Sequence, residues 1–205
     1  MTPLGEDAIR TACRAGDSRL ATEEALRAYG AEIYGLLLSR HSGDDADDAF
    51  SLFAERLFTK MGEFGFRCSM RTWVYLLARR ASRDIRRMGP RAGTRVPLSE
   101  ASGLNALVAK ARTETQSLLR AETVSAFARL REELPEDDRE LLVLRVDREM
   151  EWEDVALVFL GDEAVPSAEA RKREASRLRK RFQLVKSRLK ALALERGLLP
   201  RGNDA

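Results

Sequence analysis

The chain of 205 residues has little of several residue types that mark particular classes of protein. Two cysteines, Cys13 and Cys68, are too few for a disulfide framework, and with the single histidine, His41, they form a poor set of metal ligands. We therefore expect no metal and no cofactor. No apolar run approaches the roughly 20 residues that a membrane span needs, and the N-terminus lacks the apolar stretch of a signal peptide. These absences predict a cytoplasmic protein that does not bind a membrane.

A catalytic site is also not expected. His41 lies beside a turn and lacks the arrangement of nucleophile and base that covalent catalysis requires. The acids of residues 44–48 are adjacent in sequence, which places them around a helix start and not at one point in space. We therefore expect no catalytic residues and no enzyme activity.

Charge is abundant in this chain, and it is segregated along the sequence. Charged residues make up 34%, which favours helical surfaces, and apolar residues at 44% are enough for a core. Residues 67–97 hold nine arginines against one acid, and residues 168–196 hold eleven Lys or Arg against three Glu. Residues 131–163 reverse the balance, with thirteen acids against four arginines. Two basic blocks suggest two contacts with a polyanion, although solvated helix faces give similar charge runs.

Apolar spacing in the first part of the chain predicts helices separated by turns. Apolar residues at steps of three and four predict helices over residues 8–15 and 21–40. Ser42-Gly43 breaks the second of these, and Asp44 or Asp45 is expected to cap the next helix.

A turn and a strongly apolar helix are expected to complete this part. The apolar stripe of the preceding helix runs to Gly62, and the turn covers residues 62–69. The helix after the turn carries Trp73 and should end at Gly89-Pro90, a stop signal. These elements predict a compact domain over residues 1–90.

Residues 91–103 are rich in Gly, Pro and Ser and indicate a linker. One or two amphipathic helices are expected over residues 104–130, with Leu118, Leu119 and Val124 packed. The sequence therefore predicts an all-α protein of two small helical domains. The predicted division is a first domain over 1–90, a linker over 91–130 and a second domain over 131–205.

The second domain has the layout of a helix-turn-helix. Pro135 suits a helix start, because its missing N–H is not needed there. A short helix over 151–160 should end at Gly161, and Ser167 offers an N-cap for a long helix over 168–195. The long helix has an apolar seam at steps of three and four: Ala175, Leu178, Phe182, Val185, Leu189 and Leu192. The second helix of such a pair can enter the major groove with its N-terminal end first.

The face of the long helix away from this seam is basic. Its candidate DNA-binding residues are Ser167, Arg171, Lys172, Arg173, Ser176, Arg177 and Lys180. Arginine can bond two acceptors on guanine, whereas lysine mostly contacts phosphate. An ordinary coiled-coil-like helix with a charged exterior has the same periodicity. The scarcity of acids on this face, where only Glu174 lies near the edge, favours DNA binding.

Several segments together resemble an extracytoplasmic-function sigma factor, a bacterial transcription initiation factor of the sigma-70 family. RAGD (14–17) with Tyr29-Gly30 resembles the start of region 2, and DDAFSLFAERLF (47–58) resembles the helix that docks on the polymerase clamp. MRTWVYLLAR (70–79) resembles the family's melting and upstream-reading helix, and residues 84–87 resemble its basic end. Region 4 is resembled by Leu134-Pro135, RELLVLR (139–145) and WEDVA (152–156). The resemblance covers nearly the whole chain and is most specific around Trp73 and over residues 134–156.

The resemblance implies a protein that binds core RNA polymerase and double-stranded promoter DNA with a melted −10 segment. It implies −10 contacts from Phe64, Phe66, Arg67, Arg71, Trp73, Arg79, Arg80 and Arg83, although Trp73 also fits a core position. It implies polymerase contacts from Asp45, Asp47, Asp48, Ser51 and Glu55, of which at least one acid also fits helix capping. The helix from Ser167 to Lys180 would read the −35 element. Small factors of this family are commonly held by an anti-sigma factor, which the resemblance adds to the expected partners.

The chain departs from the family pattern at three places that bear on polymerase contacts and promoter preference. Ser51-Leu52 stands where Gln-Glu is frequent, Arg80 stands where Asn is frequent, and residues 162–166 lengthen the turn before the long helix. Two alternatives remain open. A stand-alone helix-turn-helix transcriptional repressor would bind DNA as a dimer without polymerase. A helical interaction protein would bind no DNA.

Overall fold

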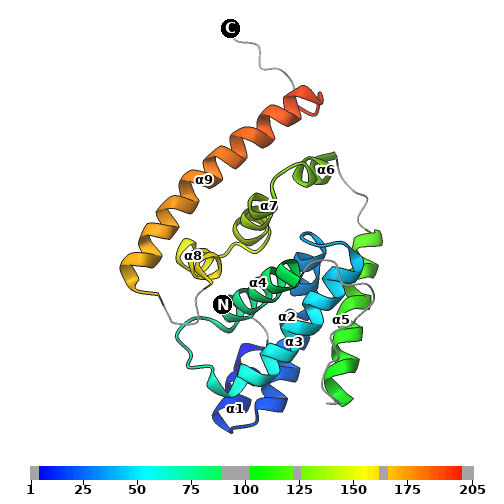
Figure 1. The fold of residues 1–205 in the computed structure, drawn as a ribbon, viewed down its shortest axis with the longest axis vertical. Coiled ribbons are helices and arrows are strands. Elements are labelled where there is room, and N and C mark those ends of the chain that lie inside the picture. The colour runs from blue at the N-terminus through cyan, green and yellow to red at the C-terminus, as the bar shows by residue number, and fades with distance from the viewer. Residues whose placement is uncertain (1–4, 89–101, 122–125, 162–165, 200–205) are drawn as a thin grey trace.

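The computed structural model describes residues 5–88, 102–121, 126–161 and 166–199, and every regular element among them is helical (Figure 1). The predicted all-α class is confirmed. The first elements are α1 (Glu6–Arg14), α2 (Ser18–Leu38), α3 (Gly43–Lys60), the 3-10 turn η1 (Met61–Glu63) and α4 (Met70–Met88). The later elements are α5 (Ser102–Ala121), α6 (Ala126–Glu132), α7 (Glu136–Leu142), the π-helical turn η2 (Val143–Asp147), α8 (Trp152–Leu160) and α9 (Ala168–Glu195).

Side-chain caps define the start of three helices. Each cap oxygen accepts a hydrogen bond from a first-turn N–H: Asp17 at α2 (2.9 Å), Ser69 at α4 (3.0 Å) and Ser167 at α9 (3.1 Å). The predicted cap at Ser167 is confirmed. The predicted cap at Asp44 or Asp45 is wrong, because α3 already begins at Gly43. Both aspartates therefore lie in its first turn, where their charge suits the helix dipole.

Helix α2 is the centre of the N-terminal half and contacts α1, α3, α4 and α5. Large side chains fill the space between these helices, among them the fully buried Ile33, Tyr34, Phe50, Phe53, Tyr75 and Leu77. The rings of Tyr34 and Phe50 pack with their centroids 5.1 Å apart. In this core the apolar stripes predicted along the sequence face one another.

Helix α5, which the sequence placed in the linker, packs along α2. A Cβ atom at Gly30 would lie 3.1 Å from the Ala111 Cβ, so the two helices approach closely at that glycine. Val108 is buried beside this contact, and the Thr115 hydroxyl donates to the Ala31 carbonyl at 3.0 Å. The predicted packing of Leu118, Leu119 and Val124 concerns side chains outside the described part of the chain.

The C-terminal half packs against the N-terminal half. Figure 1 shows α7 and α8 between α4 and α9, in agreement with the contacts of α8 with both helices. Buried apolar residues from α1 to α9 form one continuous cluster, to which α8 contributes Val155, Ala156 and Phe159. The predicted division into domains at residues 1–90 and 131–205 stays a prediction.

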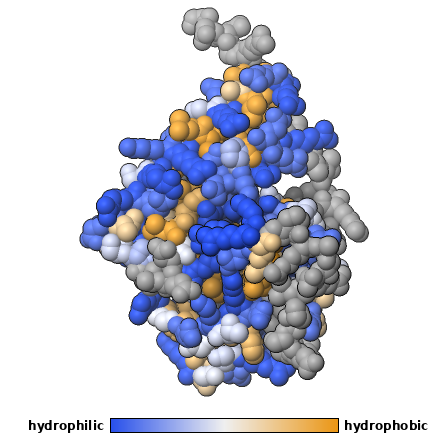
Figure 2. Space-filling model, in the orientation of Figure 1, coloured by the Kyte–Doolittle hydropathy of each residue, from blue (hydrophilic) through white to orange (hydrophobic). Residues whose placement is uncertain are grey.

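The surface has no concentrated apolar area among the exposed large side chains that the structure describes. These lie on separate elements: Leu20, Phe66, Met88, Val146 and Leu184. Figure 2 shows hydrophilic residues over most of one face, with small apolar areas between them. None of the described helices is long and apolar enough to cross a membrane.

Candidate nucleic-acid interface

The start of α9 presents a basic face to solvent. Lys172, Arg173, Ser176, Arg177 and Lys180 are all exposed, as the sequence predicted for a DNA-binding face. The seam residues at this end, Ala175 and Leu178, are buried at 1% and 0% exposure. The helix therefore separates an anchored face from a free basic face.

Besides Ser167, whose hydroxyl caps the helix, two residues of the predicted set are partly engaged. The Arg177 guanidinium donates to both carboxylate oxygens of Glu174, at 2.8 and 2.6 Å. This bidentate pair raises the pKa of Arg177 and fixes the direction of its side chain. Arg171 is half-buried beside Asp154 and Cys68 in a shallow cavity at the start of α8.

Helix α8 packs against α9. The Trp152 ring meets the Phe182 ring edge-on, with centroids 5.5 Å apart, and the Arg179 guanidinium lies 5.6 Å from the Trp152 centroid. Gly161 ends α8 with φ +64°, a left-handed conformation that suits glycine. The departure noted at residues 162–166 falls mostly outside the described residues, and only Pro166 is placed.

The turn between η1 and α4 gathers aromatic side chains. Phe64 lies between Trp73 and Phe66, with ring centroids 4.6 and 4.7 Å away. Phe66 is 42% exposed, and the guanidinium of Arg10 lies 5.3 Å from its centroid. Trp73 is half-buried, so it both packs against the core and offers one edge to the surface.

A cavity of about 250 Å³ lies beside these rings, between the turn, α4 and α8. Phe64 and Trp73 line one part of it, Arg67 and Arg80 supply positive charge, and Leu157 of α8 closes another side. Arg67 is exposed. The lining thus combines flat apolar surfaces, two arginines and one acid, Glu63. Rings and cations are the groups that bind unstacked bases and their phosphates.

Apart from Arg67, the predicted −10 arginines are bound to protein oxygens. Arg71 lies 3.3 Å from a carboxylate oxygen of Glu32. The Arg80 Nε donates to the Gly161 carbonyl at 2.8 Å, and an Arg83 nitrogen donates to the same oxygen at 3.4 Å. The structure thus places these three side chains on α4 as expected, but it pairs them with two groups of the chain itself, Glu32 and the Gly161 carbonyl.

Arg79 is the most deeply engaged of the set. Its side chain is 8% exposed and donates to Asp137 at 3.1 Å, and it also pairs with Glu140. Its guanidinium lies 4.1 Å from the centroid of the Phe159 ring. Burial, followed by the charge of Arg40, lowers the pKa of Arg79 to about 10, so Arg79 remains charged at neutral pH. Burial would raise the pKa of Asp137, but Arg79 and Arg40 outweigh it and hold that pKa below its ordinary value.

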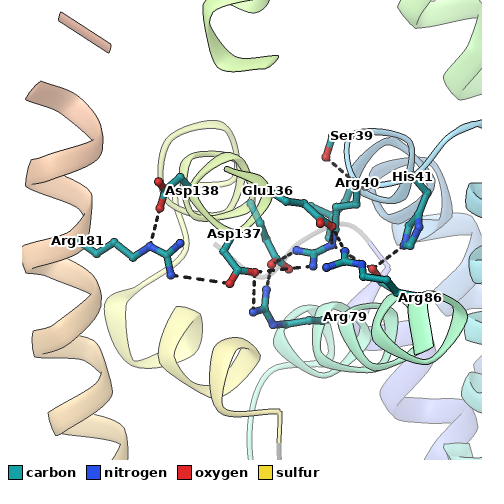
Figure 3. Close-up of polar contacts among 12 residues, drawn as sticks. Ser39, Arg40, His41, Arg79, Arg86, Glu136, Asp137, Asp138 and Arg181 are labelled. Atoms are coloured by element: carbon teal, nitrogen blue, oxygen red, sulfur yellow. Dashed lines mark hydrogen bonds and ion pairs between the residues drawn. The ribbon is translucent and has the colours of Figure 1, made fainter. Parts of the chain in front are cut away.

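An ion network at this point joins residues that are far apart in sequence (Figure 3). Arg40, with a side chain 1% exposed, lies 2.8 Å from Glu136 and 3.8 Å from Asp137 and also pairs with the fully buried Glu140. Arg86 pairs with Glu136 at its edge. The sequence analysis missed this network. The sequence holds one signal of this network, which is the contrast between the acids of residues 131–163 and the arginines of residues 67–97.

His41 adjoins the network and has a structural role. Its Nε2 lies 2.7 Å from the Ser82 hydroxyl, which also accepts a bond from Arg40 Nε at 3.0 Å. Burial, with the nearby charge of Arg86, lowers the pKa of His41. The neutral imidazole therefore prevails at pH 7.

The predicted polymerase contacts lie on α3 and are partly covered by α5. Arg112 of α5 pairs with Asp47 at 3.2 Å and donates to the Ser51 hydroxyl at 2.9 Å. Ser51 is 6% exposed, and Asp47 also accepts from the Tyr34 hydroxyl at 2.7 Å. The remaining predicted contacts, Asp45, Asp48 and Glu55, are half-buried.

The described residues contain no group of three or more His, Cys, Asp or Glu that could hold a metal ion. Burial, and after it the charge of Asp154, raises the pKa of Cys68 to about 11. A raised pKa disfavours a reactive thiolate. No protein-family model, no curated protein and no solved structure matches the chain. Its function is therefore inferred from its own residues and their geometry.

Proposed function

We propose that the chain is a bacterial sigma factor of the extracytoplasmic-function type, which binds core RNA polymerase and directs promoter-specific transcription initiation. The observation that carries this proposal is the exposed basic face at the start of α9, where Lys172, Arg173 and Lys180 point away from a buried seam. A basic helix held by a short preceding helix suits the major groove, and here it would read the −35 element. The protein would act in the cytoplasm, where its polymerase partner works.

The aromatic turn before α4 supports a second DNA contact. Phe64, Phe66 and Trp73 offer ring surfaces on which unstacked bases of a −10 element can stack. The exposed Arg67 and the neighbouring Arg80 would bind the strand's phosphates. Two contacts in one chain raise affinity through effective concentration, so each one can be weak.

The polymerase contact rests on the resemblance of α3 to the clamp-docking helix. Asp48 and Glu55 lie seven residues apart, two turns of the same helix, and are half-buried. Their carboxylates would meet a basic surface on polymerase. They would not meet DNA, because carboxylates and DNA phosphates are both negative and repel one another. An anti-sigma factor would act by covering this surface or the DNA-binding faces.

One observation favours a second candidate, the stand-alone helix-turn-helix repressor. Most predicted −10 arginines bind protein oxygens, so α9 carries the more exposed basic face of the two. A repressor of this kind would bind paired half-sites as a dimer and would not bind core polymerase.

Binding to sigma-free bacterial core polymerase separates these two candidates. The sigma factor should be a monomer that co-purifies with core. Replacing Asp48→Lys and Glu55→Lys together should weaken this binding by about tenfold, since two attractive contacts become repulsive. The matched control, Glu132→Lys with Glu195→Lys, makes the same charge change at exposed sites of the other half and should bind as the unchanged chain does. A dimer that binds DNA and ignores core would favour the repressor.

A further inference from the structure

We infer that the free chain is held in a closed state, in which acidic groups of the C-terminal half occupy the arginines that α4 would offer to DNA. This inference rests on the proposed function, because it concerns the regulation of the same DNA-binding helix. The acidic groups are Glu136, Asp137 and Glu140 of α7, which we name the acidic latch.

The carboxylates of the acidic latch bind the arginines of α4 in the way that DNA phosphates would. A guanidinium donates two roughly parallel N–H groups, which match the oxygens of a carboxylate as well as those of a phosphate. Arg79 donates to Asp137 at 3.1 Å and pairs with Glu140, while Arg86 pairs with Glu136 (Figure 3). The cationic groups on this side of α4 are thus already neutralised.

A second contact beside the acidic latch uses a backbone oxygen. The Gly161 carbonyl at the end of α8 accepts from Arg80 at 2.8 Å and from Arg83 at 3.4 Å. The approach is close, because a Cβ at Gly161 would lie 2.6 Å from an Arg83 nitrogen. Three of the arginines expected on the −10 strand therefore face the C-terminal half.

Burial makes Arg79 inaccessible while the two halves are packed, because its side chain is only 8% exposed. Glu140 is fully buried and the side chain of Arg40 is 1% exposed, so no DNA phosphate reaches this part of α4 unless α7 moves away. Breaking these ion pairs costs little net free energy, because ion pairs taken out of water recover little beyond their desolvation cost. Arginines and acids that separate would each regain hydration or a DNA partner. DNA and the acidic latch therefore compete for α4.

The test removes two of the three negative charges of the acidic latch and measures DNA binding. Asp137→Asn with Glu140→Gln leaves the side-chain shapes but deprives Arg79 of both charged partners and leaves Arg40 only Glu136. The matched control, Glu133→Gln with Asp147→Asn, removes two charges whose partners, Arg196 and Arg131, lie within the C-terminal half. The latch variant and the control both carry Lys172→Ala and Arg173→Ala, so that α9 contributes less to binding, and the chain with α9 intact is titrated beside them. The probe is a labelled single strand of about 20 nucleotides, long enough for a groove that tracks the backbone, titrated at low salt by fluorescence anisotropy.

The latch variant should bind this strand about tenfold more tightly than the control, and small-angle scattering should show a larger radius of gyration. Adding Arg80→Ala and Arg83→Ala should abolish the gain. Equal binding by variant and control would overturn the closed state while leaving the proposed function standing. Absence of DNA binding by every protein, including the chain with α9 intact, would contradict the proposed function and the inference with it.

A second measurement covers the case in which the latch variant does not fold. Hydrogen exchange of the unmodified chain is followed with and without the same strand. Displacement of α7 by DNA predicts several-fold faster exchange of the α7 amides in the presence of DNA. Unchanged α7 exchange at saturating DNA would overturn the inference.

Discussion

Glu140 is the residue on which the contact between the two halves centres. It is fully buried, it pairs with both Arg40 and Arg79, and one hundred residues separate it from Arg40. A charge of this kind persists in an interior only when it is paired, and removing one partner exposes the full cost of burying the other. The ordering of α7 against α2 and α4 thus depends on a few carboxylates.

Asp137 should make the stability of the chain depend on acid pH. Arg79 and Arg40 outweigh the effect of burial and hold its pKa below the ordinary value of about 3.9. A carboxyl with a lowered pKa in the folded state stabilises the fold above its unfolded pKa, and this contribution is lost as pH falls through the folded pKa. Asp137 is 42% exposed, so solvent screening limits the gain to about 1 kcal/mol.

Urea unfolding at a series of pH values checks this expectation. Asp137→Asn should lower the free energy of unfolding at pH 7, and the difference from the unchanged chain should shrink toward zero below about pH 4. Glu133→Gln, whose exposed pair with Arg196 contributes little, is the control. A difference that stays constant between pH 7 and pH 3 would contradict the role given to Asp137.

At the scale of elements, α9 should behave as a DNA-binding helix whose N-terminal half carries the contact. Replacing Lys172→Ala and Arg173→Ala should weaken DNA binding and lower the slope of log K against log salt by about 2, one for each lost phosphate contact. Arg188→Ala with Lys190→Ala removes the same charge from exposed positions further along the helix. This control should keep the slope. Equal slopes for both variants would mean that the basic face acts only through net charge.

Helix α5 should control access to the proposed polymerase-binding side of α3. Its Ala111 packs closely against Gly30 of α2, and its Arg112 binds Asp47 and Ser51 of α3. Ala111→Leu cannot fit this close approach, so it should cost about 1–3 kcal/mol of stability and displace α5.

Ala109→Leu makes the same substitution at an exposed position of α5 and serves as the control. Thermal unfolding should separate the two variants. Core polymerase binding should tighten for Ala111→Leu alone, because Asp47 becomes accessible. Weaker binding by a folded Ala111→Leu variant would show instead that α5 takes part in the polymerase contact.

Most elements could be predicted from the sequence, because their signals are local. Ser167, the apolar seam from Ala175 onward and Gly161 define α8 and α9 through caps and periodicity. The start of α3 could not be predicted to the residue, since Ser42, Asp44 and Asp45 are all capping types and only the backbone path selects among them.

The packing of the whole molecule was beyond what the sequence could indicate. The position of α5 depends on one glycine of α2, Gly30. Arg40 pairs with Glu140, but no local sequence feature marks these two residues as partners. Periodicity identifies which face of a helix is buried, but it does not identify the partner. The family resemblance implied a DNA contact for Arg79, whereas the described structure buries it against α7.

The whole molecule combines two proposed DNA-binding surfaces, of which the one on α4 is partly covered by α7. The continuous apolar cluster and the acidic latch hold the halves together, while the basic face of α9 stays open to solvent. Such an arrangement suits a protein that should engage a promoter only when polymerase is present. Core polymerase would supply the binding energy that separates the halves.

Reconstituted transcription tests the central claim most directly. The purified chain is added to sigma-free core polymerase with double-stranded genomic fragments from the same source, and run-off transcripts are scored. A sigma factor should give discrete transcripts that require the chain, that are reduced by Lys172→Ala with Arg173→Ala, and that persist with Arg188→Ala and Lys190→Ala. Absence of any chain-dependent transcript, together with DNA binding and no association with core, would contradict it.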